Sequence, residues 1–310
     1  MKIRTILPFF FVFLVACANV QTPSEPTPTP TPTPTFDSAK YGTAEINIPY
    51  CAAEDNMVEP LEQPVQQMDV YYPASGGPWP VFLYVHGGSW MEGDKAEGEG
   101  WRGLNEQGFL VVSLNYRLAP IHKFPTMIED LKCAVRYLRA HAGDYNLDPE
   151  RFAALGASAG GHLVALLGVA DDSAGWDEGD YPDQSSRVQA VITIAGFFDF
   201  SQPIKGGVGT PIYSAFGALP GTDSPKLIAA SPVTYLTADD PPFLLFHGTR
   251  DNIAPPEQST LMDQQLRAAG VPSTLVVVQG GDHGLGGPEA NPSPSQVYQM
   301  IVDFLNEHLK

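Results

Sequence analysis

From about residue 41 onward, short apolar runs alternate with segments of helical periodicity, and this alternation most constrains the fold of the chain. A parallel strand needs a crossover connection, usually a helix, before the next strand can begin. The pattern therefore predicts an α/β fold, with a mainly parallel sheet and helices on both of its faces. The continuous apolar runs at 190–195 and 243–247 are typical of strands buried on both sides.

Strands are expected where short apolar runs end at turn-forming residues, and helices where apolar side chains recur every three or four residues. The expected strands cover residues 68–73, 80–85, 109–115, 152–156, 190–195, 243–247 and 273–278. The expected helices cover residues 127–142, 159–169, 257–269 and 295–309. Residues 198–240 are rich in Gly, Pro, Ser and Thr, which predicts a cap-like insertion between two strands.

The start of the chain has the features of an export signal. Lys2 and Arg4 precede an apolar run, which predicts a signal peptide over residues 1–16. This run is too short to span a bilayer. It ends in LVAC, which resembles the bacterial lipobox, and the resemblance implies that Cys17 is lipidated. An ordinary cleaved signal with an incidental cysteine is the alternative.

A Thr-Pro repeat follows at residues 21–35. Proline fixes φ and lacks a backbone donor, so the repeat is expected to be an extended spacer. We therefore expect residues 17–40 to be a tether and residues 41–310 to be the folded domain. With a lipid anchor at Cys17, the domain would be held at a membrane of the bacterial cell envelope, on its extracellular or periplasmic face.

Composition excludes several classes of protein. The 17 basic and 35 acidic residues give a net charge of −18, which argues against nucleic-acid binding through a basic surface. Removal of residues 1–16 would leave 15 basic and 35 acidic residues, a net charge of −20. Past the signal, no apolar run reaches the length of about 20 residues that a spanning helix needs.

Three cysteines are too few for a disulfide-dense scaffold or a Cys-rich zinc module. Because the chain also lacks HExxH and CxxC motifs, we expect no metal and no cofactor. Cys51 and Cys133 remain after the export signal. A disulfide, one buried free thiol, and two independent cysteines all stay open for them.

The sequence GASAGGH at residues 156–162 fits the pattern G-x-S-x-G between an expected strand and an expected helix. In this context small residues permit a sharp, strained turn that exposes the serine hydroxyl at the edge of the sheet. A bare G-x-S-x-G can also be a plain structural turn, so the strand–turn–helix context carries the assignment. Ser158 is the candidate nucleophile.

The sequence HGGSW at residues 86–90 directly follows another expected strand. Glycine lets backbone N–H groups point into a site without obstruction from a Cβ atom. The N–H groups of Gly87, Gly88 and Ala159 are therefore candidate donors to a developing oxyanion. Taken alone, HGG could be a plain glycine turn. His86 is expected to brace the loop.

The candidate acid is Asp251, in the loop after the strand at 243–247. Sites in α/β sheets form at the carboxyl ends of strands, and a carboxylate there can hold an imidazole in the correct tautomer. Asp199, after the strand at 190–195, competes with it. Asp251 is favoured because it comes later and precedes a helix, although either could be a surface aspartate.

The candidate base is His283, in the Gly-rich loop GGDHG at residues 280–284. It is the one histidine that lies between Asp251 and the closing helix. A general base needs freedom to reach the serine hydroxyl, and the chain order Ser, Asp, His fits the nucleophile-elbow pattern. His162 and His247 are expected to be structural.

Together these motifs resemble the α/β-hydrolase superfamily over roughly residues 45–310. Within it, they are most similar to the hormone-sensitive-lipase-like carboxylesterases and the bifunctional feruloyl and acetyl-xylan esterases. The motifs, in order, are HGGSWMEGDK (86–95), NYRLAP (115–120) followed by FP (124–125), GASAGGH (156–162), HGTRDNIAP (247–255) and GGDHG (280–284). The resemblance implies Ser158 as nucleophile, His283 as base and Asp251 as orienting acid.

The same resemblance implies Gly87, Gly88 and Ala159 as oxyanion donors. Ser89 departs from the family pattern, because many relatives carry a third glycine there. The departure leaves the hole in place but puts the hydration of the pocket in doubt. Arg117 and Asp130 resemble the structural ion pair of the family and are not expected to be catalytic.

The implied activity is serine carboxylic-ester hydrolysis through an acyl-enzyme, on short-chain or carbohydrate-linked esters. One alternative is an exported aminopeptidase of the prolyl-oligopeptidase type, whose usual extra domain has no room in 310 residues. Another is a non-catalytic surface binding protein, which would predict a broken triad. Several aromatic residues could line a pocket, although core packing is expected for most of them: Trp90, Trp101, Phe197, Phe198 and Tyr213.

Overall fold

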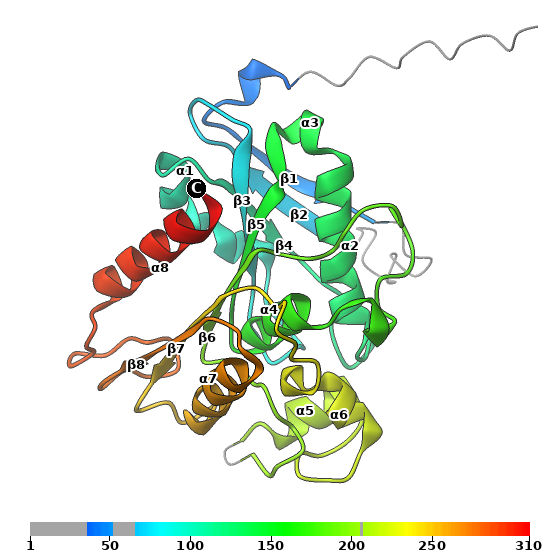
Figure 1. The fold of residues 1–310 in the computed structure, drawn as a ribbon, viewed down its shortest axis with the longest axis vertical. Helices are drawn as coiled ribbons and strands as arrows, with labels where there is room; N and C mark the ends of the chain where they lie inside the picture. The colour runs from blue at the N-terminus through cyan, green and yellow to red at the C-terminus, as the bar shows by residue number, and fades with distance from the viewer. Residues whose placement is uncertain (1–35, 52–65, 205–206) are drawn as a thin grey trace, which may run out of the picture. The chain divides into compact units, whose positions relative to one another are not determined.

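The computed structural model describes residues 36–51, 66–204 and 207–310, which fold around one eight-stranded sheet (Figure 1). The strand order is β1-β2-β4-β3-β5-β6-β7-β8. The strands are β1 (Ala44–Pro49), β2 (Gln67–Tyr71), β3 (Trp79–Val85), β4 (Leu110–Leu114), β5 (Leu147–Ala157), β6 (Ala190–Ile194), β7 (Phe243–Gly248) and β8 (Ser273–Val278). β2 runs antiparallel to both of its neighbours, and every other pair is parallel. The predicted α/β fold class is confirmed.

Helices connect the parallel strands, as the alternating sequence pattern predicts. The α-helices are α1 (Gly103–Glu106), α2 (Thr126–Ala140), α3 (Ala142–Tyr145), α4 (Ala159–Val169), α5 (Gly209–Phe216), α6 (Pro225–Ala230), α7 (Glu257–Ala269) and α8 (Pro294–Leu309). The 3-10 helices are η1 (Ser38–Lys40), η2 (Lys95–Trp101), η3 (Asp172–Ala174) and η4 (Pro232–Thr234). The four helices expected from the sequence correspond to α2, α4, α7 and α8.

Each face of the sheet is covered by its own hydrophobic core. Successive strand residues point to opposite faces, so Leu83 belongs to the cluster that includes side chains of α2, α4 and α7, whereas Phe82 belongs to the cluster that includes side chains of α8. Because both faces are covered, β3 and β7 are buried along their whole length. This explains why the parallel strands appear in the sequence as continuous apolar runs.

Strand β1 is absent from the expectations of the sequence analysis. Its residues are half-buried or exposed, Asn47 has a φ of 62°, and the strand ends at Pro49. Edge strands tolerate polar residues, irregular pairing and proline because one side has no partner. The sequence signal of this strand is a short alternation of apolar and polar residues, AEINI at 44–48, which the sequence analysis misses.

The folded region begins before residue 41. Phe36 packs edge-on against Trp79, with ring centroids 5.5 Å apart, and η1 follows directly. Residues 36–40, which the sequence analysis assigns to the tether, thus include side chains that pack on the domain. The expected signal peptide at 1–16, Cys17 and the Thr-Pro tract at 21–35 lie outside the described residues.

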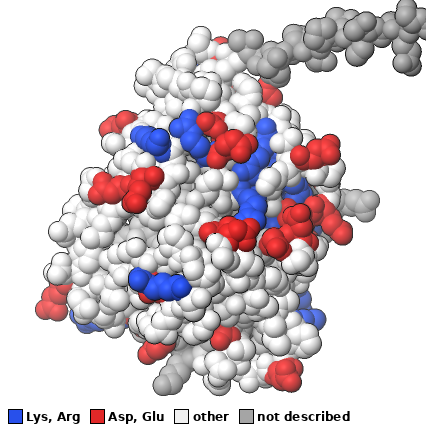
Figure 2. All heavy atoms as spheres, in the orientation of Figure 1, with Lys and Arg blue, Asp and Glu red and all other residues white. Residues whose placement is uncertain are grey.

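A disulfide joins Cys51 to Cys133, with Cα atoms 6.5 Å apart. It links the segment after β1 to α2 and so settles the pairing that the sequence leaves open. Among the described residues, no helix is long and apolar enough to cross a membrane. On the face shown in Figure 2, basic side chains lie beside acidic ones, and the lower part of that face is largely uncharged.

The segment between β6 and β7 contains α5, α6 and η4, within the stretch that the sequence predicts as a cap-like insertion. Two of its aromatic side chains, Phe200 and Phe216, pack inward rather than forming a separate core. Phe216 on α5 contacts Trp90, with ring centroids 5.1 Å apart, and Phe200 contacts Phe216 at 5.0 Å. The insertion is thereby packed onto the loop that follows β3.

Candidate active site

Ser158 occupies a strained turn between β5 and α4. Its φ of 54° and ψ of −117° lie where non-glycine residues are rare, and such a conformation typically costs about 1–3 kcal/mol. A Cβ atom on Gly156 would overlap Gly160, and one on Gly160 would overlap the Val85 carbonyl. The Ser158 N–H donates to the Ile194 carbonyl at 2.8 Å. The glycines of GASAGG therefore allow the close strand–helix contact that the turn requires.

Asp251 and His283 meet in the loops after β7 and β8. Nδ1 of His283 lies 2.7 Å from Oδ2 of Asp251. Because an ionised carboxylate only accepts hydrogen bonds, Nδ1 is the donor. Oδ1 of Asp251 accepts from the N–H groups of Ile253 at 2.8 Å and Ala254 at 2.9 Å. His283 keeps 22% of its side chain exposed and turns Nε2 away from the acid.

The Asp251 carboxylate has no solvent-exposed area. Burial by itself would raise the pKa of Asp251. Hydrogen bonds from His247, His283 and the Ile253 N–H outweigh burial and hold the pKa of Asp251 well below its ordinary value. The acid is therefore ionised and can orient the imidazole of His283.

The topology brings Ser158 to the same edge of the sheet as this pair. β5, β6, β7 and β8 are consecutive parallel neighbours, so their carboxyl ends lie side by side. Backbone bonds continue beyond the strands, from Ala195 N–H to Phe246 and from Thr249 N–H to Val278. Within the described residues the Ser158 hydroxyl has no hydrogen-bond partner, and such catalytic contacts often form fully only with substrate bound.

The loop after β3 lies against Ser158. A Cβ atom on Gly87 would be 3.0 Å from the Ala157 carbonyl oxygen and 3.5 Å from the Ser158 Cβ. Gly88 has a φ of +94°, and a Cβ there would overlap the Glu92 backbone. Glycine is thus required at residue 88 for the turn of the loop, and at residue 87 a larger side chain would press against the serine turn. Across the described chain, the N–H groups of Gly87, Gly88 and Ala159 donate no backbone hydrogen bond, which leaves them available to a ligand.

His86 braces this loop from behind, as expected. Its ring is stacked on Tyr116 with centroids 4.4 Å apart, and its Nδ1 lies 2.9 Å from the Gly87 carbonyl oxygen. The Tyr116 hydroxyl donates to the carbonyls of His86 and Gly87 at 3.1 and 3.2 Å. Burial lowers the pKa of His86. These contacts fix the direction of the carbonyls and therefore of the N–H groups that follow.

His162 joins three parts of the molecule. Its Nδ1 accepts from Trp90 Nε1 at 3.1 Å, and its Nε2 donates to the Ala230 carbonyl at 2.7 Å. Burial lowers the pKa of His162 to about 4, so the ring is neutral near pH 7. The structural role expected for His162 is confirmed, because it links α4, the loop after β3 and α6.

The remaining expected residues divide between core and surface. Arg117 and Asp130 form a buried ion pair, with Nη2 and Oδ1 2.8 Å apart, as the family resemblance implies. Trp90, Phe197 and Phe198 are buried in the core, whereas Tyr213 is exposed. Asp199 accepts from the Ser201 N–H at 2.7 Å in its own loop, and Asp251 is the acid that binds His283.

His247 has a contact that the sequence analysis misses. It is buried at the end of β7, and its Nε2 lies 3.1 Å from Oδ2 of Asp251. The sequence offers one signal for this contact, because His247 stands four residues before Asp251 at the carboxyl end of the same strand. This spacing is equally compatible with a histidine that only packs in the core.

Two cavities in the described part of the chain are lined by residues other than Ser158, Asp251 and His283. One of about 350 Å³ is lined by Gly284 and Leu285, directly after His283, and by Ile194, Trp101 and Tyr298. Its wall is mainly apolar, and the rings of Trp101 and Tyr298 are nearly parallel, at 21°. This cavity borders the loop that carries the candidate base.

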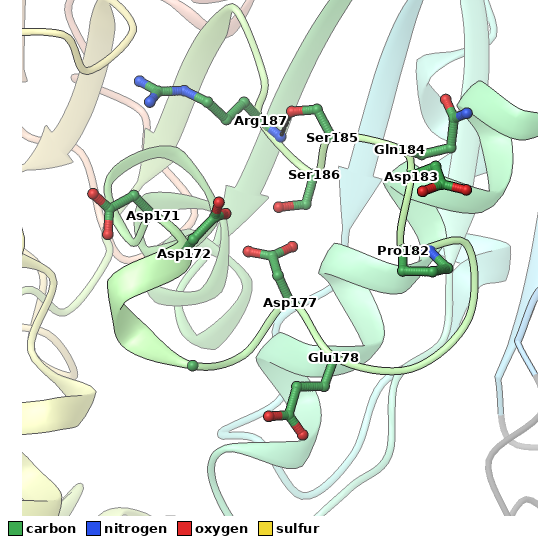
Figure 3. A pocket seen from close by; sticks show the side chains of 11 residues that line it. Asp171, Asp172, Asp177, Glu178, Pro182, Asp183, Gln184, Ser185, Ser186 and Arg187 are labelled. Carbon is green, nitrogen blue, oxygen red and sulfur yellow. Dashed lines mark hydrogen bonds between the residues drawn. The ribbon is translucent and has the colours of Figure 1, made fainter. Parts of the chain in front are cut away.

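A second cavity, of about 640 Å³, lies in the loop after α4 and contains none of the expected site residues. Figure 3 shows the carboxylates around it, including Asp171, Asp172 and Asp177. Asp177 pairs with buried Lys132 and with buried Arg136, whose Nη1 is 2.9 Å away. The pairing explains why the pKa of Asp177 is lowered despite burial, which alone would raise it. The acid therefore serves to hold this loop on α2.

A model of the BD-FAE family matches residues 68–266. "Probable carboxylic ester hydrolase LipM" of Mycobacterium tuberculosis is 33% identical over 198 residues, covering 62% of this chain and 46% of the relative. "Esterase LipC" of the same organism is 31% identical over 262 residues, covering 79% of this chain and 63% of the relative. The match thus spans about half to three-fifths of the length of these two relatives.

Solved structures agree with this assignment. A "Truncated form of carbohydrate esterase from gut microbiota" superposes with a TM-score of 0.74 at 27% identity, covering 88% of this chain and 99% of that one. Native esterase 2 of Thermogutta terrifontis superposes with a TM-score of 0.66 at 26% identity, covering 86% and 93%. With its mostly parallel sheet, its strained serine turn and the matching family model, the chain belongs to the BD-FAE family of α/β-hydrolase esterases.

Proposed function

We propose that this protein hydrolyses carboxylic esters through a covalent acyl-enzyme on Ser158. The observation that carries the proposal is the 2.7 Å bond from His283 to buried, ionised Asp251, at the sheet edge where Ser158 sits in its strained turn. An acid that fixes Nδ1 of an imidazole leaves Nε2 to accept a proton from serine. The esterase names of the relatives and structural neighbours support the same reaction.

In the first half of the reaction, Nε2 of His283 accepts the Ser158 proton while the serine oxygen attacks the ester carbonyl carbon. The N–H groups of Gly87, Gly88 and Ala159 stabilise the oxyanion. His283 then gives its proton to the leaving alcohol, and the acyl group stays on Ser158. Water repeats the sequence, releasing the acid and restoring the serine hydroxyl.

For the substrate, we favour short-chain or carbohydrate-linked esters. The similarity to a carbohydrate esterase supports the carbohydrate linkage. The apolar cavity beside the His283 loop, with the rings of Trp101 and Tyr298 in its wall, suits an aromatic acyl group such as feruloyl. The exported aminopeptidase remains the second candidate, because the same triad also cleaves amides.

Hydrolysis of p-nitrophenyl acetate, a feruloyl methyl ester, acetylated xylan and an aminoacyl anilide tests the proposal directly. We expect turnover of esters and little of the anilide. Ser158→Ala should stay folded and lose several orders of magnitude in kcat, whereas Ser173→Ala, exposed on η3, should match the wild type. Wild-type-like activity of Ser158→Ala would contradict the mechanism. Preference for the anilide would favour the aminopeptidase, and no turnover at all would favour the binding protein.

We further propose that the protein is exported and anchored through lipidated Cys17. The disulfide between Cys51 and Cys133 supports export, because disulfides persist in oxidising compartments. Two acyl chains on Cys17 would give stable membrane attachment. In a bacterial host, the full chain should fractionate with membranes, and Cys17→Ala should release it to the soluble fraction. Equal partitioning of the two proteins would refute the anchor.

A further inference from the structure

Two imidazoles, rather than one, lie against the carboxylate of Asp251. His283 Nδ1 lies 2.7 Å from Oδ2, and His247 Nε2 lies 3.1 Å from the same oxygen. We propose that His247 is a positioning residue of the active site, which fixes Oδ2 of Asp251 so that this oxygen can orient His283. The inference rests on the proposed esterase function and adds a residue to its machinery.

The neighbours of His247 determine which of its ring nitrogens donates. Nε2 faces the Ala254 carbonyl at 3.0 Å as well as the Asp251 carboxylate. Both of these groups only accept hydrogen bonds, so Nε2 must carry the proton. On the other side of the ring, Nδ1 lies 2.7 Å from the hydroxyl of Ser259, which can donate to it. Ser259 therefore sets the tautomer in which His247 donates toward Asp251.

The donors around Asp251 show what His247 adds. Oδ1 is held by two backbone N–H groups of its own loop, from Ile253 and Ala254. Oδ2 lies next to a ring nitrogen of each histidine. The side chain of His247 is almost completely buried, whereas 22% of the His283 side chain is exposed. The catalytic imidazole is partly exposed and is itself the group that Asp251 must orient, so a second, buried neighbour is needed to support the acid. His247, placed by the end of β7, supplies a fixed support.

This arrangement predicts a defect in the chemical step rather than in substrate binding. Without the His247 donor, a buried carboxylate oxygen loses one of its partners, and the orientation of His283 becomes less well defined. His247 lies behind Asp251 and is not expected to touch the substrate. Its loss should therefore lower kcat and leave KM nearly unchanged.

The test compares His247→Met with His247→Gln, using p-nitrophenyl acetate as the probe. Methionine fills a similar volume without a donor, whereas glutamine can place an amide N–H near the position of Nε2. We expect kcat to fall about 10- to 100-fold in His247→Met, by analogy with the loss seen when a group that orients a metal-ligating side chain is removed. KM should change less than twofold, because the lost interaction acts in the transition state and not in the binding of the substrate. His247→Gln should recover much of kcat, and His308→Gln, on α8, is the matched histidine control.

A second variant and a second measurement keep the test independent of folding and of turnover. Ser259→Ala keeps the histidine and removes its Nδ1 partner, so it should lower kcat by a smaller factor than His247→Met. Proton NMR of the wild type should show a low-field resonance from the His283 N–H bonded to Asp251, and this resonance should shift or broaden in both variants. It can be observed even if no ester is hydrolysed, in which case only the proposed function fails. Unchanged kcat and an unchanged resonance in folded His247→Met or Ser259→Ala would overturn the positioning role.

Discussion

His162 should make the stability of the protein fall in mild acid. The ring is fully buried, and burial lowers the pKa of His162 from 6.5 to about 4. In the unfolded chain the same ring binds a proton near pH 6.5, so between these values the unfolded state holds more protons than the folded state. Stability must therefore decrease as the pH falls through this interval, and below about pH 4 the contribution is constant.

The size of this effect follows from the shift. The difference of about 2.5 pKa units between 6.5 and 4 corresponds to about 3.4 kcal/mol in the limit of low pH. Relative to pH 8, His162 should destabilise the fold by about 1.4 kcal/mol at pH 5.5 and by about 2.6 kcal/mol at pH 4.5. For a domain whose total stability is typically about 5–15 kcal/mol, this loss is large.

Urea unfolding of the wild type and His162→Gln at pH 8, 5.5 and 4.5 measures the effect. Glutamine retains hydrogen-bonding groups but does not titrate, so the variant should start less stable and lose less stability on acidification. The difference between the two pH dependences should equal the values above, while His308→Gln should follow the wild type. Parallel curves for wild type and His162→Gln would refute the reasoning, because the ring would then titrate alike in both states.

Three further results are expected. Asp130→Asn removes one charge of the buried pair with Arg117 and should destabilise the fold by about 3–5 kcal/mol. Denaturant unfolding measures this loss, and a change below about 1 kcal/mol would mean that the pair is solvated. Cys133→Ser opens a long cross-linked loop and should lower stability by about 2–4 kcal/mol, and dithiothreitol should lower the Tm of the wild type but not that of the variant. Gly87→Ala places a methyl group against the turn at Ser158, so kcat/KM should fall at least tenfold while the Tm changes little. A variant of Gly87 with full activity would contradict the close approach of this loop to the nucleophile.

Much of the fold could be predicted from the sequence, because its parallel strands are buried on both faces. A fully buried strand must be a continuous apolar run, and its crossover must be a helix with one apolar face. These local constraints mark β3 to β7 and the four longer helices, while β8, partly exposed at the edge of the sheet, still keeps an apolar run. They do not mark β1, whose one signal is the short alternation AEINI before Pro49.

The candidate catalytic residues could also be predicted from the sequence, because each lies in a turn whose backbone conformation requires particular residue types. Ser158 needs Gly156 and Gly160 for its strained backbone, and Gly88 needs a positive φ. Turns of this kind require glycines at fixed spacings, and such spacings can be recognised in the sequence without a structure. Its place in the chain favours Asp251 over Asp199 as the candidate acid, and Asp251 is the one of the two that binds His283.

Tertiary structure decided which distant groups share one partner. The sequence contains seven histidines, and nothing local distinguishes one that donates to Asp251 from one that fills a core. The bond from His283 to Asp251, the bond from His162 to Ala230 and the bridge between Cys51 and Cys133 all depend on how the sheet and its loops fold together. By itself the sequence determined the strands, the helices and the reactive turns, since these obey short-range rules of burial and backbone conformation. The supports of those turns required the folded chain, because a hydrogen bond across many residues leaves no trace in local pattern.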